Sequence, residues 1–339
     1  MKQSTSTIAV LGDGAWGTAT ATLLANNGHR VSLWCYDADV ARLIAQTRRN
    51  ERYLPGFTLD DAIVPTTNIR EAVCGVQWVF EAIPVKFLRT VLSTARDCYE
   101  PQQTWVVLSK GIEQDTLLLP SDIIDDVFGC NVSKAVMSGP SYAHDLACKQ
   151  ITAVTIAASD CETANALQAL LANDYFRPYV TLDMIGAQAG GALKNVITLG
   201  VGMLDGAGYT DNAKAFLLTR GFDEMVRLAV ALGGTRETLY GLSGIGDLVL
   251  TATGKLSRNA AVGKRLGAGE PLDAIVQHIG STPEGINTII AVNQLAQKLN
   301  LELPICNGLH RVIFEGLPLA QMLDELMNRP LERECEARV

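Results

Sequence analysis

The chain has 339 residues, of which 48% are hydrophobic and 19% are charged, and its formal net charge is −8. This length predicts a globular protein with two domains rather than a single core. The acidic balance argues against nucleic acid as a partner, because surfaces that bind phosphate backbones are usually basic. It is compatible with a small anionic substrate, since a few local cations can outweigh the overall charge.

Neither a secretory leader nor a metal centre is expected. Residues 1–7 contain no long apolar region. The eight cysteines are scattered without a Cys-x-x-Cys pair or a Cys/His cluster, which argues against a zinc site and a disulfide framework. The most apolar helical stretch, residues 185–204, contains polar residues such as Lys194 that a bilayer would penalise. We therefore expect a cytoplasmic protein with no metal and no membrane span.

In the first half of the chain, short β-branched runs alternate with helical patterns. A helix is expected from Ala15 to about Asn27, where Gly28 stops it. Strands alternating with helices predict a mostly parallel sheet with helices on both faces. The expected strands are residues 7–11, 30–34, 78–82, 105–108, 135–137 and 153–156.

From about Gly186 onward, helical periods dominate and no convincing strand remains. The expected helices are residues 187–204, 213–232, 257–266, 272–278, 285–299 and 319–326. The change of pattern falls between Val180 and Gly190, without a Pro- or Ser-rich linker. The fold class is therefore α/β, with an N-terminal sheet domain over residues 1–185 and a C-terminal all-helical domain over residues 186–339.

The glycine-rich run Gly12-Asp13-Gly14-Ala15-Trp16-Gly17 lies between the first strand and the first helix. It matches G-x-G-x-x-G, and Asp37 follows Gly17 by 20 residues, just past the second strand. In that context the pattern is the dinucleotide fingerprint of a Rossmann-type domain. The glycines permit a tight turn, and the helix N-terminus offers free N–H groups to a pyrophosphate. A glycine-rich turn in a non-binding domain is the alternative.

The choice between NAD and NADP stays open at this point. Asp37 would accept a hydrogen bond from a ribose 2′-hydroxyl and so favours NAD. A 2′-phosphate usually needs an arginine, which Arg42 or Arg48 could supply. Asp13 places a carboxylate inside the loop, where it must point away from the phosphates or weaken binding.

Two polar segments follow strands of the predicted sheet. Ser109-Lys110-Gly111 comes directly after one strand, and Ser138-Gly139-Pro140-Ser141-Tyr142-Ala143 comes after another. Ligands of open parallel sheets lie at the carboxyl ends of the strands, so Lys110 is placed to reach one. The alternatives are a solvated surface lysine and an ordinary turn.

Lys194 stands inside the most apolar helix of the chain. A lysine there must extend to the surface, pair with an acid or line a cavity. Burial lowers a lysine pKa because the charged form is desolvated, and a pKa near neutrality suits a general acid or base. A side chain that merely extends to the surface is the alternative.

Three further groups lie in the helical half. If residues 244–251 are helical, Asp247 and Thr251 share a face, and the carboxylate could orient Lys194. Ser257-Arg258-Asn259 opens a helix with a hydroxyl, a guanidinium and an amide, which suits a phosphate. For Asp247 and Ser257 the alternative role is helix capping. Glu284, in Thr282-Pro283-Glu284-Gly285, is the third candidate, and its alternative role is that of an ordinary acid in the first turn of a helix.

Together these segments resemble bacterial NAD(P)-dependent glycerol-3-phosphate dehydrogenases. They occur in the family's order and cover nearly the whole chain, and jointly they are specific although each alone is weak. The matching segments are residues 12–19, 108–111, 138–141, 191–196, 246–248 and 257–259.

The resemblance implies hydride transfer between NAD(P)H and C2 of dihydroxyacetone phosphate, giving glycerol 3-phosphate for glycerophospholipid synthesis. The substrate would lie between a Rossmann domain and a helical domain. Lys194 matches the catalytic proton acceptor, and Lys110 matches a second active-site lysine that contacts substrate and cofactor. Asp247 and Thr251 match polar groups around the catalytic lysine.

The resemblance also implies a full set of ligand contacts. The implied substrate-binding residues are Lys110, Gly139, Ser141, Lys194, Asp247, Ser257, Arg258 and Asn259, with Arg258 and Asn259 on the phosphate side. Together with the fingerprint, the expected NAD or NADP contacts are Gly12, Gly14, Ala15, Trp16, Gly17, Tyr36, Asp37, Lys110, Ala143, Arg258, Thr282 and Glu284.

The sequence departs from the family pattern at three places. Asp13 replaces a small residue, and Tyr36 stands where members often carry His or Arg for the adenosine end. Thr282-Pro283 replaces a more usual apolar pair. The first two departures bear on cofactor preference rather than on the chemistry.

Other interpretations make different demands on the chain. A dehydrogenase of the β-hydroxyacid type is the alternative enzyme, and the 257–259 cluster and Ser109-Lys110-Gly111 argue against it. A catalytically silent nucleotide-sensing module would leave Lys110 and Lys194 unexplained. The helical domain could also form a homodimer surface.

Overall fold

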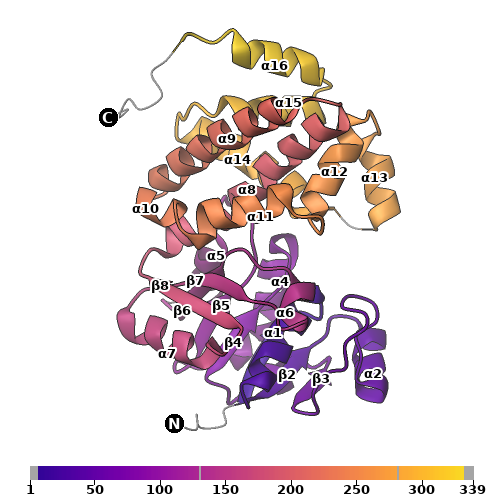
Figure 1. The fold of residues 1–339 in the computed structure, drawn as a ribbon. Coiled ribbons are helices and arrows are strands. Elements are labelled where there is room, and N and C mark those ends of the chain that lie inside the picture. The colour runs from indigo at the N-terminus through magenta and orange to yellow at the C-terminus, as the bar shows by residue number, and fades with distance from the viewer. Residues whose placement is uncertain (1–6, 130, 281, 332–339) are drawn as a thin grey trace.

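The computed structural model describes residues 7–129, 131–280 and 282–331, and it consists of a sheet-containing half below a helical half (Figure 1). Eight strands form one sheet in the order β3-β2-β1-β4-β5-β6-β7-β8. Neighbouring strands are parallel except for β6 and β7, so the predicted mostly parallel sheet is confirmed. The strands are β1 (Thr7–Leu11), β2 (Arg30–Trp34), β3 (Ile63–Thr66), β4 (Trp78–Glu81), β5 (Thr104–Val107), β6 (Ser133–Ser138), β7 (Thr152–Ala158) and β8 (Phe176–Thr181).

The two outermost strands, β3 and β8, are the ones that the sequence pattern missed. Each contains a proline, Pro65 in β3 and Pro178 in β8. Proline cannot donate to a sheet ladder, so it argues against a central strand but is accepted at an edge. Both strands are edges of the sheet, which reconciles their composition with their position.

Alternate residues of the strands face opposite layers of helices. Ile8 and Val10 of β1 belong to the core that includes α1 (Ala15–Asn26) and α7 (Cys161–Leu171). Ala9 and Leu11 belong to the core on the other face, with α4 (Val85–Ala95) and α5 (Pro120–Phe128). This period of two leaves the strand ends free to present loops. The remaining helical elements of this half are α2 (Ala38–Thr47), α3 (Ile69–Val73), a 3₁₀ turn (Arg96–Cys98) and α6 (Ala143–Ala147).

The helical half is built around α8 (Met184–Gly206), whose residues 186–204 are all buried. Glycines let its neighbours approach closely: a Cβ on Gly202 would lie 2.4 Å from the Ala260 carbonyl oxygen. No strand occurs among the described residues after 183, which agrees with the prediction of an all-helical second half. The surrounding elements are α9 (Asp211–Ala231), α10 (Arg236–Leu239), a π-helical turn (Leu242–Gly246), α11 (Asp247–Thr253), α12 (Arg258–Gly267), α13 (Leu272–Ile279), α14 (Glu284–Lys298), α15 (Pro304–Phe314) and α16 (Leu319–Met327).

Helix α15, which the sequence pattern missed, is capped by a residue from a distant helix. Glu224 of α9 is only 1% exposed, and it accepts hydrogen bonds from the backbone N–H groups of Ile305 (2.6 Å) and Cys306 (2.9 Å). A carboxylate suits a helix N-terminus because the first N–H groups lack partners within the helix. Such a cap cannot be found by scanning the residues just before the helix.

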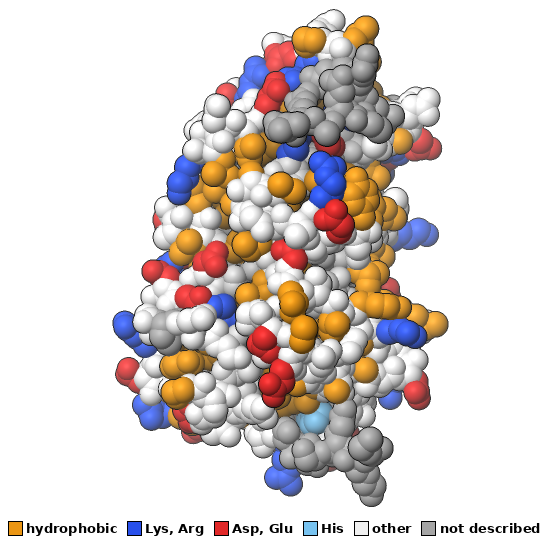
Figure 2. All heavy atoms as spheres, turned by 90° about the vertical axis from the view of Figure 1, so that its left-hand side faces the viewer, with side chains coloured by type: hydrophobic (Ala, Val, Ile, Leu, Met, Phe, Trp, Pro, Cys, Tyr) orange, Lys and Arg blue, Asp and Glu red, His pale blue; other side chains and the backbone are white. Residues whose placement is uncertain are grey.

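The surface carries mixed charges and some exposed apolar side chains. Figure 2 shows basic and acidic side chains interspersed on the face that includes the β8 edge of the sheet. Exposed hydrophobic residues of the chain include Leu182, Val230 and Tyr240. Within the described residues, no helix is both long enough and apolar enough to cross a bilayer.

Candidate active site

The glycine-rich loop is held in a conformation that side chains would obstruct. Gly12 has a φ of +119°, and a Cβ there would lie 2.7 Å from the Ala82 carbonyl oxygen. A Cβ on Gly17 would lie only 2.0 Å from the carbonyl oxygen of Gly12. Glycine is therefore required at both positions, as the fingerprint predicts.

The N-terminus of α1 is open toward a ligand. Gly14 caps this helix without a side-chain hydrogen bond, and no atom lies within 4 Å of a Cβ built on it. The first N–H groups, from Ala15 and Trp16 onward, are thus not satisfied by a capping side chain. A cradle of glycine backbone at the N-terminus of α1 fits the pyrophosphate of a dinucleotide.

Asp13 does not crowd that cradle. Asp13 is 7% exposed, and burial raises the pKa of its carboxyl group. The backbone N–H groups of Tyr36 and Asp37, just after β2, oppose part of that shift. The backbone oxygen of Asp13 accepts a hydrogen bond from Asn50 at 2.7 Å. The carboxyl group therefore faces the second strand rather than the phosphate position, which resolves the conflict posed by an acid in the loop.

Asp37 has partners of its own in the structure. One carboxylate oxygen caps α2 by accepting from the N–H of Asp39 at 2.8 Å, and the other pairs with the Arg52 guanidinium. Tyr36 is 82% exposed and makes an edge contact with Trp34. The arginine nearest this carboxylate is therefore Arg52, and neither Arg42 nor Arg48 pairs with it. An acid for a ribose hydroxyl and a cation for a 2′-phosphate thus stand side by side.

The centre of the site is a buried lysine beside a buried carboxylate. Lys194 of α8 is 7% exposed, and its Nζ lies 2.5 Å from Oδ1 of Asp247 and 2.8 Å from Oγ1 of Thr251. Residues 247 and 251 belong to α11, so the conditional prediction that they share one helical face is confirmed. The Lys194 side chain does not extend to the surface.

Lys110 reaches the same carboxylate from the sheet half. Its Nζ lies 2.6 Å from Oδ2 of Asp247 and donates to the Gly139 carbonyl oxygen at 3.3 Å. Each oxygen of Asp247 therefore holds one ammonium group, and the two lysines meet at the junction of the halves. Both charges remain paired even though Asp247 is 1% exposed.

The electrostatics of this cluster bring Lys194 close to a working range for proton transfer. Its pKa is lowered to about 8, chiefly by desolvation and also by the Lys110 charge, while Asp247 opposes the shift. An amine with such a pKa can give and take a proton near neutral pH. The arrangement can therefore exchange a proton with an oxygen placed next to Lys194.

The loop after β6 lines the same junction. Gly139 has a φ of +153°, and Oγ of Ser141 donates to its carbonyl oxygen at 3.0 Å. A Cβ on Gly191 of α8 would lie 2.8 Å from Oγ of Ser138 and 3.4 Å from the Lys110 side chain. Gly191 thus makes room where the sheet end and α8 approach each other.

The three residues of the 257–259 cluster differ in whether they already have hydrogen-bond partners. Ser257 caps α12 by accepting from the Ala260 N–H at 3.2 Å. The amide of Asn259 donates to Asn195 at 2.9 Å and accepts from the Gly285 N–H at 3.2 Å. Arg258 is exposed and makes no hydrogen bond or ion pair with another described residue. The free guanidinium is therefore the group best placed to take an anion.

Glu284 lies against the Lys110 segment. A Cβ on Gly111 would lie 3.2 Å from its carboxylate oxygen. Burial raises the pKa of Glu284 to about 7, and the nearby Arg258 charge opposes this shift. Thr282 is half-buried two residues before it, and Ala143 begins α6 on the sheet side. These positions surround the same junction from both halves.

Three residues outside the predicted set also contribute to the site. Asn195 holds Asn259 through the hydrogen bond described above. The hydroxyl of Tyr142 donates to the Leu250 carbonyl oxygen at 3.0 Å and so ties the sheet half to α11. Glu81 accepts from Ser109 next to Lys110. Asn195 could have been found from its place beside Lys194, whereas the other two depend on contacts between distant segments.

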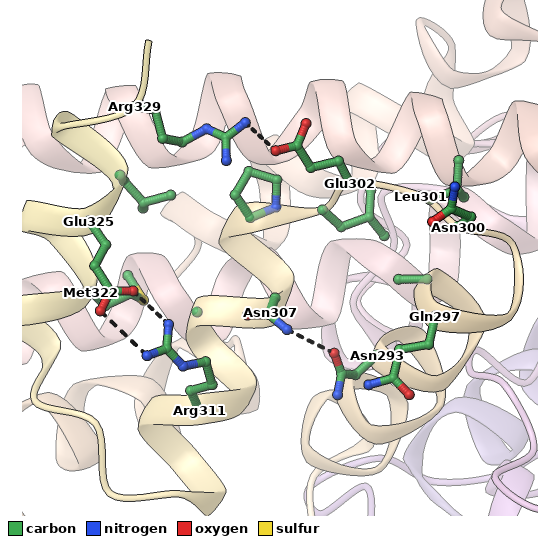
Figure 3. A pocket seen from close by; sticks show the side chains of 15 residues that line it. Asn293, Gln297, Asn300, Leu301, Glu302, Asn307, Arg311, Met322, Glu325 and Arg329 are labelled. Carbon is green, nitrogen blue, oxygen red and sulfur yellow. Dashed lines mark hydrogen bonds and ion pairs between the residues drawn. The ribbon is translucent and has the colours of Figure 1, made fainter.

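A hollow of about 410 Å³ lies among α14, α15 and α16, away from the sheet (Figure 3). Its charged side chains are paired with one another, Arg311 with Glu325 and Arg329 with Glu302. It contains neither of the site lysines. Nor do the described residues include a group of His, Cys, Asp and Glu side chains that could hold a metal ion.

A dinucleotide-binding sheet whose strand ends face a helical domain with a buried lysine is the construction of a two-domain NAD(P)-dependent dehydrogenase. Models of NAD-dependent glycerol-3-phosphate dehydrogenase match the chain twice. The N-terminal model matches residues 7–164, and the C-terminal model matches residues 183–324. The chain belongs to the NAD-dependent glycerol-3-phosphate dehydrogenase family, as its motifs predict.

Individual relatives agree with this assignment. Glycerol-3-phosphate dehydrogenase [NAD(P)+] from Bacillus velezensis is 40% identical over 331 residues, covering 97% of this chain and 96% of the relative. The protein of the same name from Rhodospirillum rubrum is 42% identical over 334 residues, covering 98% and 95%. The crystal structure of glycerol-3-phosphate dehydrogenase from Coxiella burnetii superposes with a TM-score of 0.92 at 34% identity, covering 96% of this chain and 99% of that one.

The fold alone extends further. A ketopantoate reductase from Ralstonia eutropha superposes with a TM-score of 0.60 at 15% identity. A sheet domain joined to a helical domain is thus shared by dehydrogenases with other substrates, so the fold does not decide the substrate.

Proposed function

We propose that this chain catalyses hydride transfer between NAD(P)H and C2 of dihydroxyacetone phosphate, forming sn-glycerol 3-phosphate. The observation that carries this proposal is the pair of lysines, Lys110 and Lys194, held on the single carboxylate of Asp247 where the two halves meet. A carbonyl group that accepts hydride needs both positive charge and a proton at its oxygen, and this cluster can supply both. The product would feed glycerophospholipid synthesis.

In this proposal the cofactor-binding domain ends at residue 185, and the substrate-binding domain follows it. Residues 1–185 hold the cofactor through the glycine loop and the N-terminus of α1, with Asp37 and Tyr36 at the adenosine end. Residues 186–339 supply Lys194, Asp247 and the phosphate-binding cluster. Bound NAD(P)H supplies the hydride, or NAD(P)+ accepts it, and the side chains of the chain supply the remainder of the chemistry. The expected cofactor contacts Ala143, Thr282 and Glu284 belong to the same proposal.

Lys194 is the proposed general acid and base. In reduction its ammonium group gives a proton to the C2 oxygen, and in oxidation the neutral amine takes that proton from the C2 hydroxyl. Lys110 stabilises negative charge on the oxygen as it develops. Asp247 keeps both ammonium groups in place, and the Thr251 hydroxyl accepts a further hydrogen bond from Lys194.

The phosphate end of the substrate binds to the helical domain in this proposal. Arg258 is exposed and unpaired among the described residues, so its guanidinium can bind a phosphate without breaking an existing ion pair. Ser257 and Asn259 flank it at the N-terminus of α12. Gly139 and Ser141 contact the substrate from the sheet side. Phosphate binding would orient C2 toward the two lysines.

The direct test follows NADH and NADPH oxidation in parallel with dihydroxyacetone phosphate as the substrate. We expect turnover with this substrate and little with unphosphorylated dihydroxyacetone, because the phosphate anchors the substrate. A panel with ketopantoate and other 2- and 3-oxoacids serves as the control. Preferred turnover of an oxoacid, or binding of NADH without any turnover, would refute the proposal.

We also propose that the chain is cytoplasmic and forms a homodimer. The apolar side chains of Val230 and Tyr240 are exposed on the helical half, and such groups are often covered by a partner. Sedimentation velocity of the parent chain and of Tyr240→Glu tests the dimer. A monomeric parent chain at micromolar concentration would contradict it.

A further inference from the structure

A buried acid lies at the root of the Lys110 loop and has no place in the chemistry proposed above. Glu81 is the last residue of β4, paired in register with Leu11 of β1 and Val107 of β5, and it is 0% exposed. It makes no ion pair with another described residue. A carboxylic acid at the centre of a parallel sheet is costly to bury without a cation. Its position therefore calls for a compensating role.

The side chain of Glu81 joins the ends of two neighbouring strands. Its Oε1 accepts from the hydroxyl of Ser109 at 2.7 Å and from the N–H of Ser109 at 3.3 Å. Its Oε2 accepts from the N–H of Ile83 at 3.3 Å. Its backbone oxygen accepts from the N–H of Leu108 at 3.0 Å. The loop that leaves β5 is thus fixed to β4 by one residue, through both its side chain and its backbone oxygen.

Lys110 follows Ser109 directly, in a segment that is neither helix nor strand. The lysine is held at its tip by Asp247 and the Gly139 carbonyl group, and its chain passes Gly191 of α8. The contacts of Ser109 with Glu81 fix the residue next to Lys110 to β4, beyond the backbone hydrogen bond that Leu108 makes with Glu81. Without the contacts between Ser109 and Glu81, the Lys110 ammonium group could still pair with Asp247, but the backbone of Lys110 would be free to shift.

We propose that Glu81 is a positioning residue for Lys110: by holding Ser109 it fixes where the Lys110 ammonium group stands beside Asp247. This inference rests on the proposed function, in which Lys110 stabilises the developing oxyanion. Burial also raises the pKa of Glu81 to about 8, which agrees with an acid kept in the sheet at the expense of stability. Glu81 does not touch the substrate, because it is completely buried.

The experiment compares Glu81→Leu, Glu81→Gln and Ser109→Ala with the double variant Glu81→Leu/Ser109→Ala. We expect Glu81→Leu to lower kcat roughly 10- to 100-fold, since displacements near 1 Å can cost that much. The KM for NADH should change less than about threefold, because the side-chain hydrogen bonds of Glu81 are with Ser109 and Ile83 rather than with the glycine loop. Glu81→Gln retains one acceptor oxygen and should lose less activity. The double variant should be no worse than Glu81→Leu alone, because Ser109→Ala removes a hydrogen bond that Glu81→Leu has already removed.

Glu224→Leu is the matched control, because Glu224 is equally buried and also accepts two backbone N–H groups, far from the lysines. It should lower the thermal midpoint without changing kcat, whereas Glu81→Leu should lower kcat with little loss of thermal stability. A folded Glu81→Leu variant with kcat within about twofold of the parent would overturn the proposal, as would multiplicative losses in the double variant. If Glu81→Leu does not fold, unchanged kcat in both Ser109→Ala and Glu81→Gln overturns it. An inactive parent chain would instead refute the proposed function, and the inference with it.

Discussion

The two halves of the candidate site are built from different materials. The sheet half presents backbone: the glycine loop, the free N–H groups of α1 and the Gly139 carbonyl group. The helical half presents long side chains, with Lys194 and Asp247 packed between helices and Arg258 left at the surface. Lys110 extends from the sheet half to pair with Asp247 of the helical half.

This difference separates two ways of making a binding site rigid. Backbone in a tight loop is fixed by local sterics, and a single added Cβ is enough to disturb it. A buried charge is fixed by its partners, and it is costly once one partner is removed. Substitutions in the glycine loop should therefore act on cofactor binding, and substitutions at the buried charges or at Arg258 should act on turnover or on substrate binding.

The largest effect is expected at Lys194. Lys194→Ala removes the proposed proton donor and should lower kcat about 10³- to 10⁴-fold, the upper range for general acid–base catalysis. NADH affinity, measured by fluorescence titration, should stay close to that of the parent, because Lys194 belongs to the helical half. Residual turnover within about tenfold of the parent would remove Lys194 from the mechanism.

The complementary substitution in the sheet half is Gly17→Ala. A Cβ here would lie 2.0 Å from the Gly12 carbonyl oxygen, so the loop must shift. We expect NADH affinity to fall roughly 10- to 100-fold, because overpacking typically costs 1–3 kcal/mol. Calorimetric titration measures the affinity. Gly28→Ala is a control for backbone strain without overlap, because its φ of +90° disfavours alanine but no atom lies within 4 Å of the added Cβ. Equal losses in both variants would contradict a steric role for Gly17.

Arg258→Ala should mainly weaken binding of the phosphorylated substrate. Loss of a charge-assisted hydrogen bond to phosphate should raise the KM for dihydroxyacetone phosphate roughly 10- to 100-fold. Turnover of unphosphorylated dihydroxyacetone should change little, because that substrate lacks the group that Arg258 binds. Steady-state kinetics with both substrates checks this. Equal losses for the two substrates would show that the phosphate site lies elsewhere.

The pH dependence tests the Lys194 environment. With its pKa lowered to about 8, kcat/KM for glycerol 3-phosphate oxidation should rise with pH and level off above that value, because the neutral amine takes the proton. Reduction needs the ammonium form, so its kcat/KM should fall as pH rises through the same region. Below the inflection, the oxidation rate should change about tenfold per pH unit.

Thr251→Val provides the control for that profile. The Thr251 hydroxyl accepts from the Lys194 ammonium group at 2.8 Å and so favours its charged form. Its removal should move the inflection to lower pH. An inflection at the same pH in both proteins would mean that another group titrates.

These expectations also show which parts could be predicted from the sequence. The glycine loop could be predicted because Gly12, Gly14 and Gly17 lie close together in the sequence, and a Cβ on Gly17 would meet the Gly12 carbonyl oxygen. The strands β3 and β8 could not be predicted in this way. Each contains a proline that only an edge strand accepts, and the edges are known only from the assembled sheet. Local pattern therefore predicts the central strands, but it misses strands whose composition is accepted only at an edge of the sheet.

Within the site, the limit is the distance along the chain. Lys110, Lys194 and Asp247 were each identified as candidates, but no spacing rule places 110 and 194 on opposite oxygens of one carboxylate. At the adenosine end, the sequence analysis named Arg42 or Arg48 as the cation near Asp37. In the structure Asp37 pairs with Arg52 instead. Glu81 looked like a strand residue, and only its contact with Ser109 connects it to the site.

The smallest effect is expected at Ser257, where capping and substrate binding compete as explanations. Its hydroxyl oxygen accepts from the Ala260 N–H, so Ser257→Ala should cost about 1 kcal/mol of unfolding free energy, as for other N-caps. The same hydroxyl can still donate its own hydrogen to a phosphate, which would add a rise of a few-fold in KM. Urea unfolding and substrate kinetics on Ser257→Ala measure the two effects separately. Ser257→Asn, which keeps a capping oxygen, should restore stability; if it also restores KM fully, the residue acts on the substrate only by keeping Arg258 at the start of an intact helix.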